Sequence, residues 1–185
     1  MSPKENFISQ LHTANYEHKK WLNSIKVLVS GISMDKESIP LNEMDTPFGT
    51  WLYRDAMVFS THNSKSVLEE ISNLYTRCYE SYLKIYGLVF MGKSEGFLQG
   101  LFSSNKLSHS QLLLAQKYYE ELVIVSDALI KRMRTFENQM YATSSEKFDH
   151  LFPEAEVSTE VNTKGHVAEV SEKAPRYYRG SLVED

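Results

Sequence analysis

The chain has 185 residues, of which 42% are hydrophobic and 24% are charged, and this composition predicts one soluble globular domain with a terminal extension. The formal net charge of −4 leaves no excess of Lys and Arg to neutralise phosphates, so we expect no nucleic-acid partner. A single cysteine excludes an intrachain disulfide, which favours a reducing compartment. Because the chain shows neither an apolar signal segment nor an apolar run of about 20 residues, we expect a cytoplasmic protein without a membrane span.

The first predicted helix covers about residues 3–32. Ser2 suits its N-cap, Pro3 suits its first position, and Gly31 favours its end. Two rows of residues spaced by seven give it the inward-facing pattern of a bundle helix. The members of the two rows are Phe7, Leu11, Ala14, His18, Trp21, Ile25, Leu28 and Ile32.

Residues 33–66 break this pattern, because Pro40 and Pro47 punctuate a loop in which a short helical turn follows Gly49. The second long helix is predicted at about residues 66–91, with Cys78 on its core row. A second row of aromatic residues lies beside the core row: Tyr75, Tyr79, Tyr82 and Tyr86. These tyrosines are a candidate partner-binding surface, or they complete the bundle with their hydroxyls pointing outward.

The third long helix begins with the capping box Ser108 and Gln111 and keeps its heptad pattern to about Ala142. At 1.5 Å per residue, this helix is about 50 Å long. Its inner rows include Ser126 as a polar member. Together these elements predict an all-α fold, an antiparallel four-helix bundle with a long C-terminal helix and a disordered tail.

The tail is predicted at residues 144–185, after a bundle at residues 1–143. It holds nine acidic and five basic residues, whereas the bundle holds 15 of each, so the tail carries the net charge. Its composition and lack of period predict an acidic, flexible segment, from which Phe148, Leu151 and Phe152 can dock on the bundle. Near its end, a candidate docking motif for a partner reads Arg176-Tyr177-Tyr178-Arg179.

The sequence contains no nucleophile elbow, phosphate loop, dinucleotide glycine motif or His-Glu-x-x-His, so we expect no catalytic activity. His18 is placed on the inner face, where a buried imidazole needs hydrogen-bond partners. It is a core histidine or a metal ligand. With Ser81 or Ser126, it also forms a candidate polar layer that fixes helix register.

His18 on the first helix, with Trp21 three residues later, is followed in the loop by the run Thr46-Pro47-Phe48-Gly49-Thr50-Trp51. These two pieces resemble the chemoreceptor zinc-binding domain family, CZB, over about residues 8–142. That family is a four-helix bundle, found alone, in chemoreceptors and ahead of diguanylate cyclase domains. Its zinc is held by a first-helix histidine, the cysteine of a Cys-x-Phe-Gly-x-Trp turn and a helical His-x-x-x-His.

Most of the family's zinc ligands are replaced in this chain. Thr46 stands in place of the cysteine. The paired histidines fall on Asn73 and Arg77 when counted from Phe48, and on Leu74 and Cys78 when counted by helix face. Because structural zinc needs four closely placed ligands, we expect no cofactor.

One alternative rebuilds a zinc site from His18, Asp45 and Cys78. Without zinc, the resemblance leaves Phe48, Gly49 and Trp51 with a structural role. In that role the two aromatic rings anchor the loop, and the glycine permits a tight turn with a positive φ.

The resemblance implies a non-catalytic bacterial sensory or regulatory domain that acts through protein partners in signal transduction, as in chemotaxis. We also expect a homodimer, because a bundle with a second apolar face dimerises readily and the family is often dimeric. A zinc sensor with a rearranged site around His18 and Cys78 is one alternative. A chaperone or adaptor that binds a client through its bundle surface or its tail is another.

Overall fold

The computed structural model describes residues 1–61, 63–91, 108–152, 177–178 and 181–182. The chain divides into two compact units, Met1–Pro153 and Glu154–Asp185. The described elements of the first unit are all helical, which confirms the all-α prediction. Among the described helices, none combines the length and the apolar character needed to cross a membrane.

The described residues of the first unit form five α-helices. They are α1 (Pro3–Val29), α2 (Pro47–Thr50), α3 (Lys65–Tyr86), α4 (His109–Ala142) and α5 (Ser145–Leu151). Short 3₁₀ and π-helical segments lie between them. These are η1 (Lys36–Ser38), η2 (Glu43–Asp45), η3 (Trp51–Asp55), η4 (Ala56–Thr61) and η5 (Gly87–Met91). The three predicted long helices therefore exist, with ends within a few residues of their expected positions, since η5 continues α3 to Met91.

Local signals in the sequence fix the ends of the long helices. Ser2 caps α1 in a capping box with Glu5, and Ser108 caps α4 in a capping box with Gln111. Gly31 follows the end of α1 with a φ of 80°, a left-handed conformation that glycine adopts without strain. These predicted start and stop signals are confirmed.

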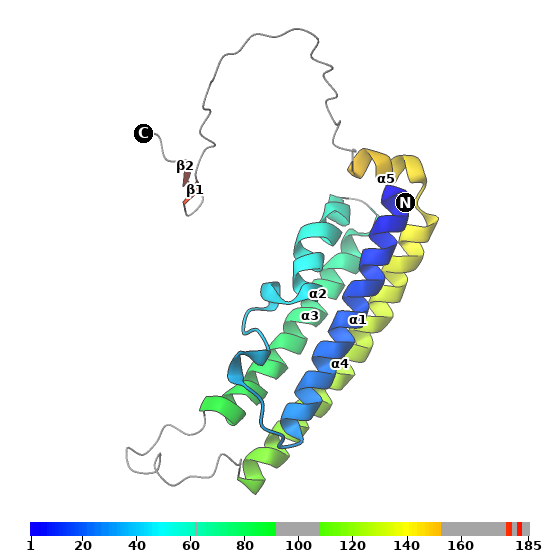
Figure 1. The fold of residues 1–185 in the computed structure, drawn as a ribbon. Helices are drawn as coiled ribbons and strands as arrows, with labels where there is room; N and C mark the ends of the chain where they lie inside the picture. The colour runs from blue at the N-terminus through cyan, green and yellow to red at the C-terminus, as the bar shows by residue number, and fades with distance from the viewer. Residues whose placement is uncertain (62, 92–107, 153–176, 179–180, 183–185) are drawn as a thin grey trace. The chain divides into compact units, whose positions relative to one another are not determined.

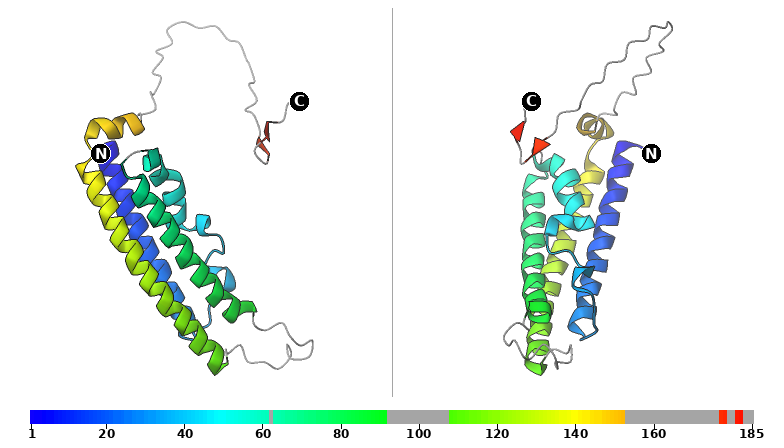
Figure 2. Two further views of the ribbon diagram at one scale, coloured as in Figure 1. Left: turned by 180° about the vertical axis from the view of Figure 1, so that it is seen from behind. Right: turned by 60° about the vertical axis from the view of Figure 1, so that its left-hand side comes forward.

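The helices α1, α3 and α4 lie side by side, and α4 packs against both of the others (Figures 1 and 2). His12 contacts Glu137 at 2.6 Å and His18 contacts Ser126 at 2.8 Å. Moving along α1 from His12 to His18, the contacting residue on α4 moves back from Glu137 to Ser126. The two helices α1 and α4 therefore run in opposite directions. One predicted inner row of α4 is completely buried: Ala115, Leu122, Leu129 and Phe136.

The segment from η2 to η4 occupies the remaining side of this helical core. Its α2 and η3 contact α1, and its η4 contacts α3. Gly49 lies in α2 rather than in a turn with positive φ, so that prediction is wrong. Glycine is required there for a different reason, because a Cβ atom would lie 1.9 Å from the carbonyl oxygen of Glu43.

The helix α5 belongs to the first unit, which extends to Pro153, whereas the sequence predicts that the bundle ends at residue 143. Phe148 is fully buried, and its ring centroid lies 5.9 Å from that of Phe7 and 5.2 Å from that of Phe59. The ammonium of Lys4 donates to the carbonyl oxygens of Tyr141 and Thr143 and fastens the α4–α5 junction to α1. A helix of seven residues is too short to show a period, which is why the sequence pattern missed it.

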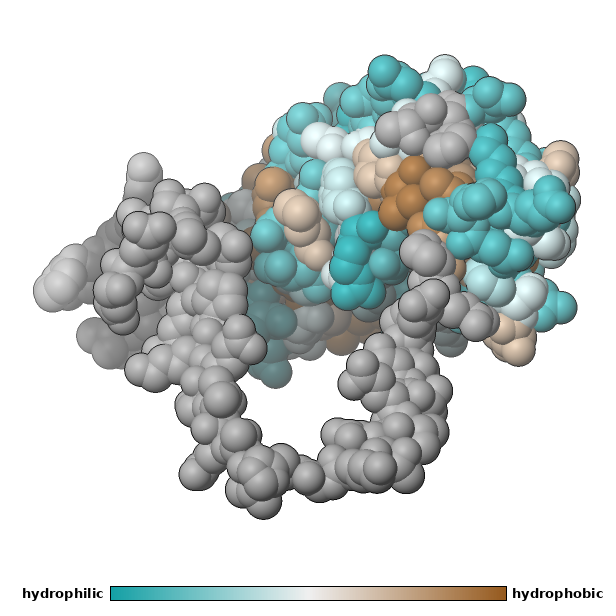
Figure 3. All heavy atoms as spheres, turned by 90° about the horizontal axis from the view of Figure 1, so that it is seen from above, coloured by the Kyte–Doolittle hydropathy of each residue, from teal (hydrophilic) through white to brown (hydrophobic). Residues whose placement is uncertain are grey.

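Viewed from the end that carries α5, the surface of the first unit is mainly hydrophilic with a small hydrophobic area (Figure 3). The described part of the second unit is one antiparallel ladder of β1 (Tyr177–Tyr178) and β2 (Ser181–Leu182). Tyr177 and Tyr178 of the predicted docking motif lie in this ladder, whereas Arg176 and Arg179 lie outside the described residues. Most of the predicted flexible tail lies outside them as well.

Candidate functional site

His18 lies in the middle of α1 with only 1% of its surface exposed. Its Nε2 atom is 2.8 Å from the Oγ atom of Ser126 on α4, and Ser126 is completely buried. Of the two serines that the sequence offered as partners, the structure selects Ser126. The predicted polar layer between two helices is therefore present.

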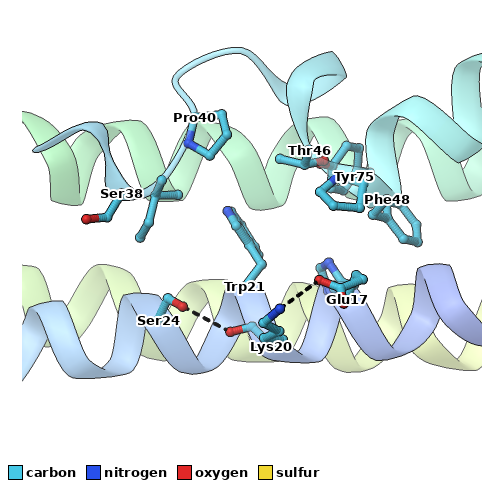
Figure 4. Close-up of a pocket in the computed structure, with 12 residues that line it drawn as sticks. Glu17, Lys20, Trp21, Ser24, Ser38, Pro40, Thr46, Phe48 and Tyr75 are labelled. Atoms are coloured by element: carbon cyan, nitrogen blue, oxygen red, sulfur yellow. Dashed lines mark hydrogen bonds and ion pairs between the residues drawn. The ribbon is translucent and has the colours of Figure 1, made fainter. Parts of the chain in front are cut away.

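A pocket of about 140 Å³ opens beside His18. Figure 4 shows that α1 supplies one wall with Glu17, Lys20, Trp21 and Ser24, while the loop before α3 supplies the opposite wall. The remaining lining residues are Ser38, Ile39, Pro40, Thr46, Pro47, Phe48 and Tyr75. The sequence pattern did not reveal this pocket, because its walls come from segments that are about 20 to 55 residues apart.

Two residues that line this pocket each carry a buried polar atom without a hydrogen-bond partner, namely His18 with Nδ1 and Trp21 with Nε1. The rings of His18 and Trp21 are stacked, with centroids 5.5 Å apart. Burial, helped by the nearby charge of Lys19, lowers the pKa of His18 to about 4. The imidazole is therefore neutral at pH 7.

The hydroxyl of Thr46, which stands where the resemblance places a cysteine, is engaged in hydrogen bonds within the protein. Thr46 caps α2, because its Oγ1 atom accepts from the backbone N–H of Gly49 at 2.9 Å. The same atom donates to the carbonyl oxygen of Glu43 at 3.0 Å and is hydrogen-bonded to the hydroxyl of Tyr75. Tyr75 thus stands beside Thr46.

The tyrosine row of α3 is buried, so it completes the bundle and is not an exposed partner-binding surface. The prediction that its hydroxyls point outward is wrong for Tyr79 and Tyr82. The hydroxyl of Tyr79 donates to the carbonyl oxygens of Pro40 and Asn42, and that of Tyr82 donates to the carbonyl oxygen of Ile39. Their rings pack in the core with those of Tyr75 and Tyr86. Burial raises the pKa of Tyr75, Tyr79 and Tyr82 above the ordinary value. The row binds the chain's own loop.

The residues of the alternative zinc site are not brought together. Within the described part of the chain, no group of three His, Cys, Asp or Glu side chains could hold a metal ion. Asp45 is exposed at the surface, whereas Cys78 is fully buried. Burial raises the pKa of the Cys78 thiol to about 12, which disfavours the thiolate that metals and electrophiles require. The donor set present therefore does not fit zinc.

Phe48 and Trp51 are buried core residues. The ring of Phe48 lies 5.2 Å from that of His18, and the ring of Trp51 lies 6.2 Å from that of Phe7.

Comparison of the chain with models of protein families, with curated proteins and with solved structures found no match.

Proposed function

We propose that the chain is a non-catalytic sensory or regulatory domain of bacterial signal transduction, a relative of the CZB domains that has lost their zinc ligands. The observation that carries the proposal is His18, a buried and neutral imidazole with one unpaired nitrogen on the wall of a pocket. In this proposal the pocket at His18 receives the signal, and a protein partner reads it, as in chemotaxis.

The proposed architecture is an antiparallel four-helix bundle whose second member is broken. The helices α1, α3 and α4 supply three positions, and the segment from η2 to η4 supplies the fourth. The contacts of this segment with both α1 and α3 support the assignment. A short, interrupted second helix also fits the resemblance to a bundle that carries its Phe-Gly-x-Trp turn at this place.

The proposal of a non-catalytic role rests on the chemistry of the polar layer. A serine nucleophile must be reachable by substrate, and its histidine is oriented by a third group. Ser126 is completely buried, and the Nδ1 atom of His18 has no partner in the described structure. The raised pKa of Cys78 disfavours thiol chemistry as well.

Independence from zinc is supported by the hydrogen bonds of Thr46, which use the position of the family's cysteine for α2 capping and for the contact with Tyr75. Metal analysis of protein purified without chelator tests this part. Because structural zinc needs four ligands and this site lacks them, we expect less than about one tenth of a zinc ion per chain. One zinc per chain that is lost in His18→Ala would contradict it.

A second copy of this chain is the partner that we propose first. Large hydrophobic side chains are exposed on α1 and α4, where a dimer would cover them. They are Tyr16, Val27, Leu113, Leu114, Ile124 and Tyr141. Light scattering coupled to size exclusion gives the mass in solution, and Ile124→Glu is expected to convert a dimer to a monomer, whereas Glu121→Gln leaves it intact.

The sensory function is tested by protein capture with the full chain. We expect the captured partner to be lost or reduced at least about fivefold in His18→Phe, which fills the pocket, and to be unchanged in His12→Gln, an exposed histidine outside it. Both variants must keep the melting temperature of a folded protein. Equal capture by the two variants would separate partner binding from the pocket and overturn the sensory role.

A further inference from the structure

The hydrogen positions at His18 follow from its partner. Ser126 is completely buried, and among the described residues His18 Nε2 is its side-chain hydrogen-bond partner. A buried hydroxyl hydrogen needs an acceptor. Ser126 therefore donates to Nε2, and the neutral imidazole carries its own hydrogen on Nδ1. The unpaired nitrogen of His18 is a donor.

Two residues of the pocket lining thus carry unpaired N–H donors, because the indole Nε1 of Trp21 can only donate. Five buried side-chain atoms lack a partner in the described part of the chain, and these two share a pocket. The hydroxyls of Thr46 and Tyr75 are bonded to one another and to the carbonyl oxygen of Glu43. An occupant that supplies acceptor oxygens would satisfy both donors.

The charges at the pocket mouth restrict this occupant. Lys20 lines the pocket and places an ammonium group at its edge, which attracts an anion. Glu17 also lines the pocket, and its carboxylate lies 3.4 Å from the ammonium of Lys20. The two groups together carry no net charge, so nothing at the mouth offsets a second negative charge, and a dianion such as phosphate or sulfate is disfavoured more than a monoanion that pairs with Lys20.

The size and walls of the pocket restrict the occupant further. The volume of about 140 Å³ is below the range of roughly 300–1,000 Å³ that is typical for drug-sized ligands. The rings of Trp21, Phe48 and Tyr75 and the side chain of Ile39 give it apolar walls. These walls suit a short hydrocarbon chain and exclude a bulky one.

We propose that this pocket binds a short-chain monocarboxylate, with its oxygens on His18 Nδ1–H and Trp21 Nε1–H and its alkyl group against Phe48 and Ile39. The inference deepens the proposed function and rests on it, because it names the class of signal. A carboxylate bound there would bridge α1 and the loop at residues 38–48, which form the two walls. Its arrival would change the contact between these segments.

The test is a titration of the ¹⁵N-labelled full chain with sodium acetate, propionate and butyrate at constant ionic strength. Trp21 and Trp51 are the two tryptophans, and Trp21→Phe assigns their indole N–H signals. We expect a saturable shift of the Trp21 signal with a dissociation constant on the order of 1 mM, and little shift of the Trp51 signal. Acetamide, inorganic phosphate and sodium chloride are expected to give no saturable shift.

Lys20→Gln and Lys19→Gln form a matched pair of exposed substitutions on α1, of which only the first changes a pocket residue. We expect Lys20→Gln to weaken propionate binding at least fivefold and Lys19→Gln to change it less than twofold. His18→Phe, which fills the pocket, should abolish the shift.

The inference is overturned by any of three results. These are the absence of a saturable shift up to about 50 mM, well above the expected dissociation constant, an equal response to acetamide or phosphate, and equal effects of the two lysine substitutions. Partner capture that still depends on His18 would then leave the sensory function standing with a different ligand. Carboxylate binding without any partner would retain the inference and remove the sensory function.

Discussion

The Nε2 atom of His18 lies 2.8 Å from the Oγ atom of Ser126, across the interface between α1 and α4. Both side chains are buried, so this hydrogen bond replaces contacts that each group makes with water in the unfolded chain. The other ring nitrogen of His18 is buried and lacks a partner, on a residue that lines the pocket. The same residue thus serves the core with one nitrogen and the candidate site with the other.

Ser126→Ala should destabilise the protein, because it leaves the Nε2 atom of His18 buried without a partner. The expected loss in the free energy of unfolding is about 1–3 kcal/mol, measured by urea denaturation at pH 7. Ser24→Ala is the control, since the hydroxyl of Ser24 bonds only to a carbonyl of its own helix at a half-exposed position. It should stay within about 0.5 kcal/mol of the wild type. Equal losses in the two variants would show that the layer does not stabilise the fold.

The stability of the protein should fall as the pH is lowered from about 6.5 towards 4. The pKa of His18 is lowered from 6.5 to about 4 in the folded state, so the unfolded chain binds more protons in this window. The neutral ring of His18 makes its full contribution to the free energy of unfolding above pH 6.5, and about 2 kcal/mol of this contribution is lost by pH 5. Urea denaturation of the wild type and of His18→Gln at pH 7 and pH 5 separates this loss from the titration of other groups.

The variant His18→Gln lacks the titrating ring, so its stability should change less between the two pH values than that of the wild type. Ser24→Ala is the control, because it removes no titrating group and its hydroxyl bonds only within its own helix. It should retain the wild-type pH dependence. An identical pH dependence in wild type and His18→Gln would show that the imidazole is hydrated in the folded state.

The long helices and the place of His18 could be predicted from the sequence, because heptad spacing and capping boxes are local signals. The spacing that puts Leu122, Leu129 and Phe136 in the core also puts His18 and Ser126 there. Burial of a polar residue at a core position of a regular helix follows directly from its register. The sequence alone does not decide whether His18 pairs with Ser81 or with Ser126.

The pocket and the role of the tyrosines could not be predicted, because they depend on the path of an irregular loop. Tyr79 and Tyr82 look amphipathic on α3 taken alone, and nothing in their spacing shows that the loop at residues 39–42 covers them. The hydroxyl of Tyr75 is likewise hydrogen-bonded to Thr46, which lies 29 positions earlier in the chain. Turn residues mark where such a loop begins, but packing decides where it lies.

Gly49→Ala should destabilise the protein strongly. An added Cβ would lie 1.9 Å from the carbonyl oxygen of Glu43 and 2.8 Å from its carbonyl carbon, so η2 and α2 would have to separate. A loss of about 2–3 kcal/mol in the free energy of unfolding is expected for overpacking against backbone. Thermal and urea denaturation both measure it.

Gly87→Ala is the matched control, because a Cβ at Gly87 meets no atom within 4 Å and the backbone φ is −57°. Removing the flexibility of a helical glycine should leave stability unchanged or raise it by up to about 1 kcal/mol. If both substitutions had the same effect, close approach at Gly49 would not be the reason for glycine at that position.

Two truncations should separate the folded unit from the rest of the chain. A chain that ends at Pro153 keeps α5, and we expect its melting temperature to match that of the full protein. A chain that ends at Thr143 loses Phe148, whose ring fills the core beside Phe7 and Phe59. Loss of a buried phenylalanine costs about 3–5 kcal/mol, so the shorter chain should melt at a much lower temperature. Phe148→Ala in the full chain should reproduce most of that loss, whereas equal stability of the two truncations would place the end of the folded unit at residue 143 after all.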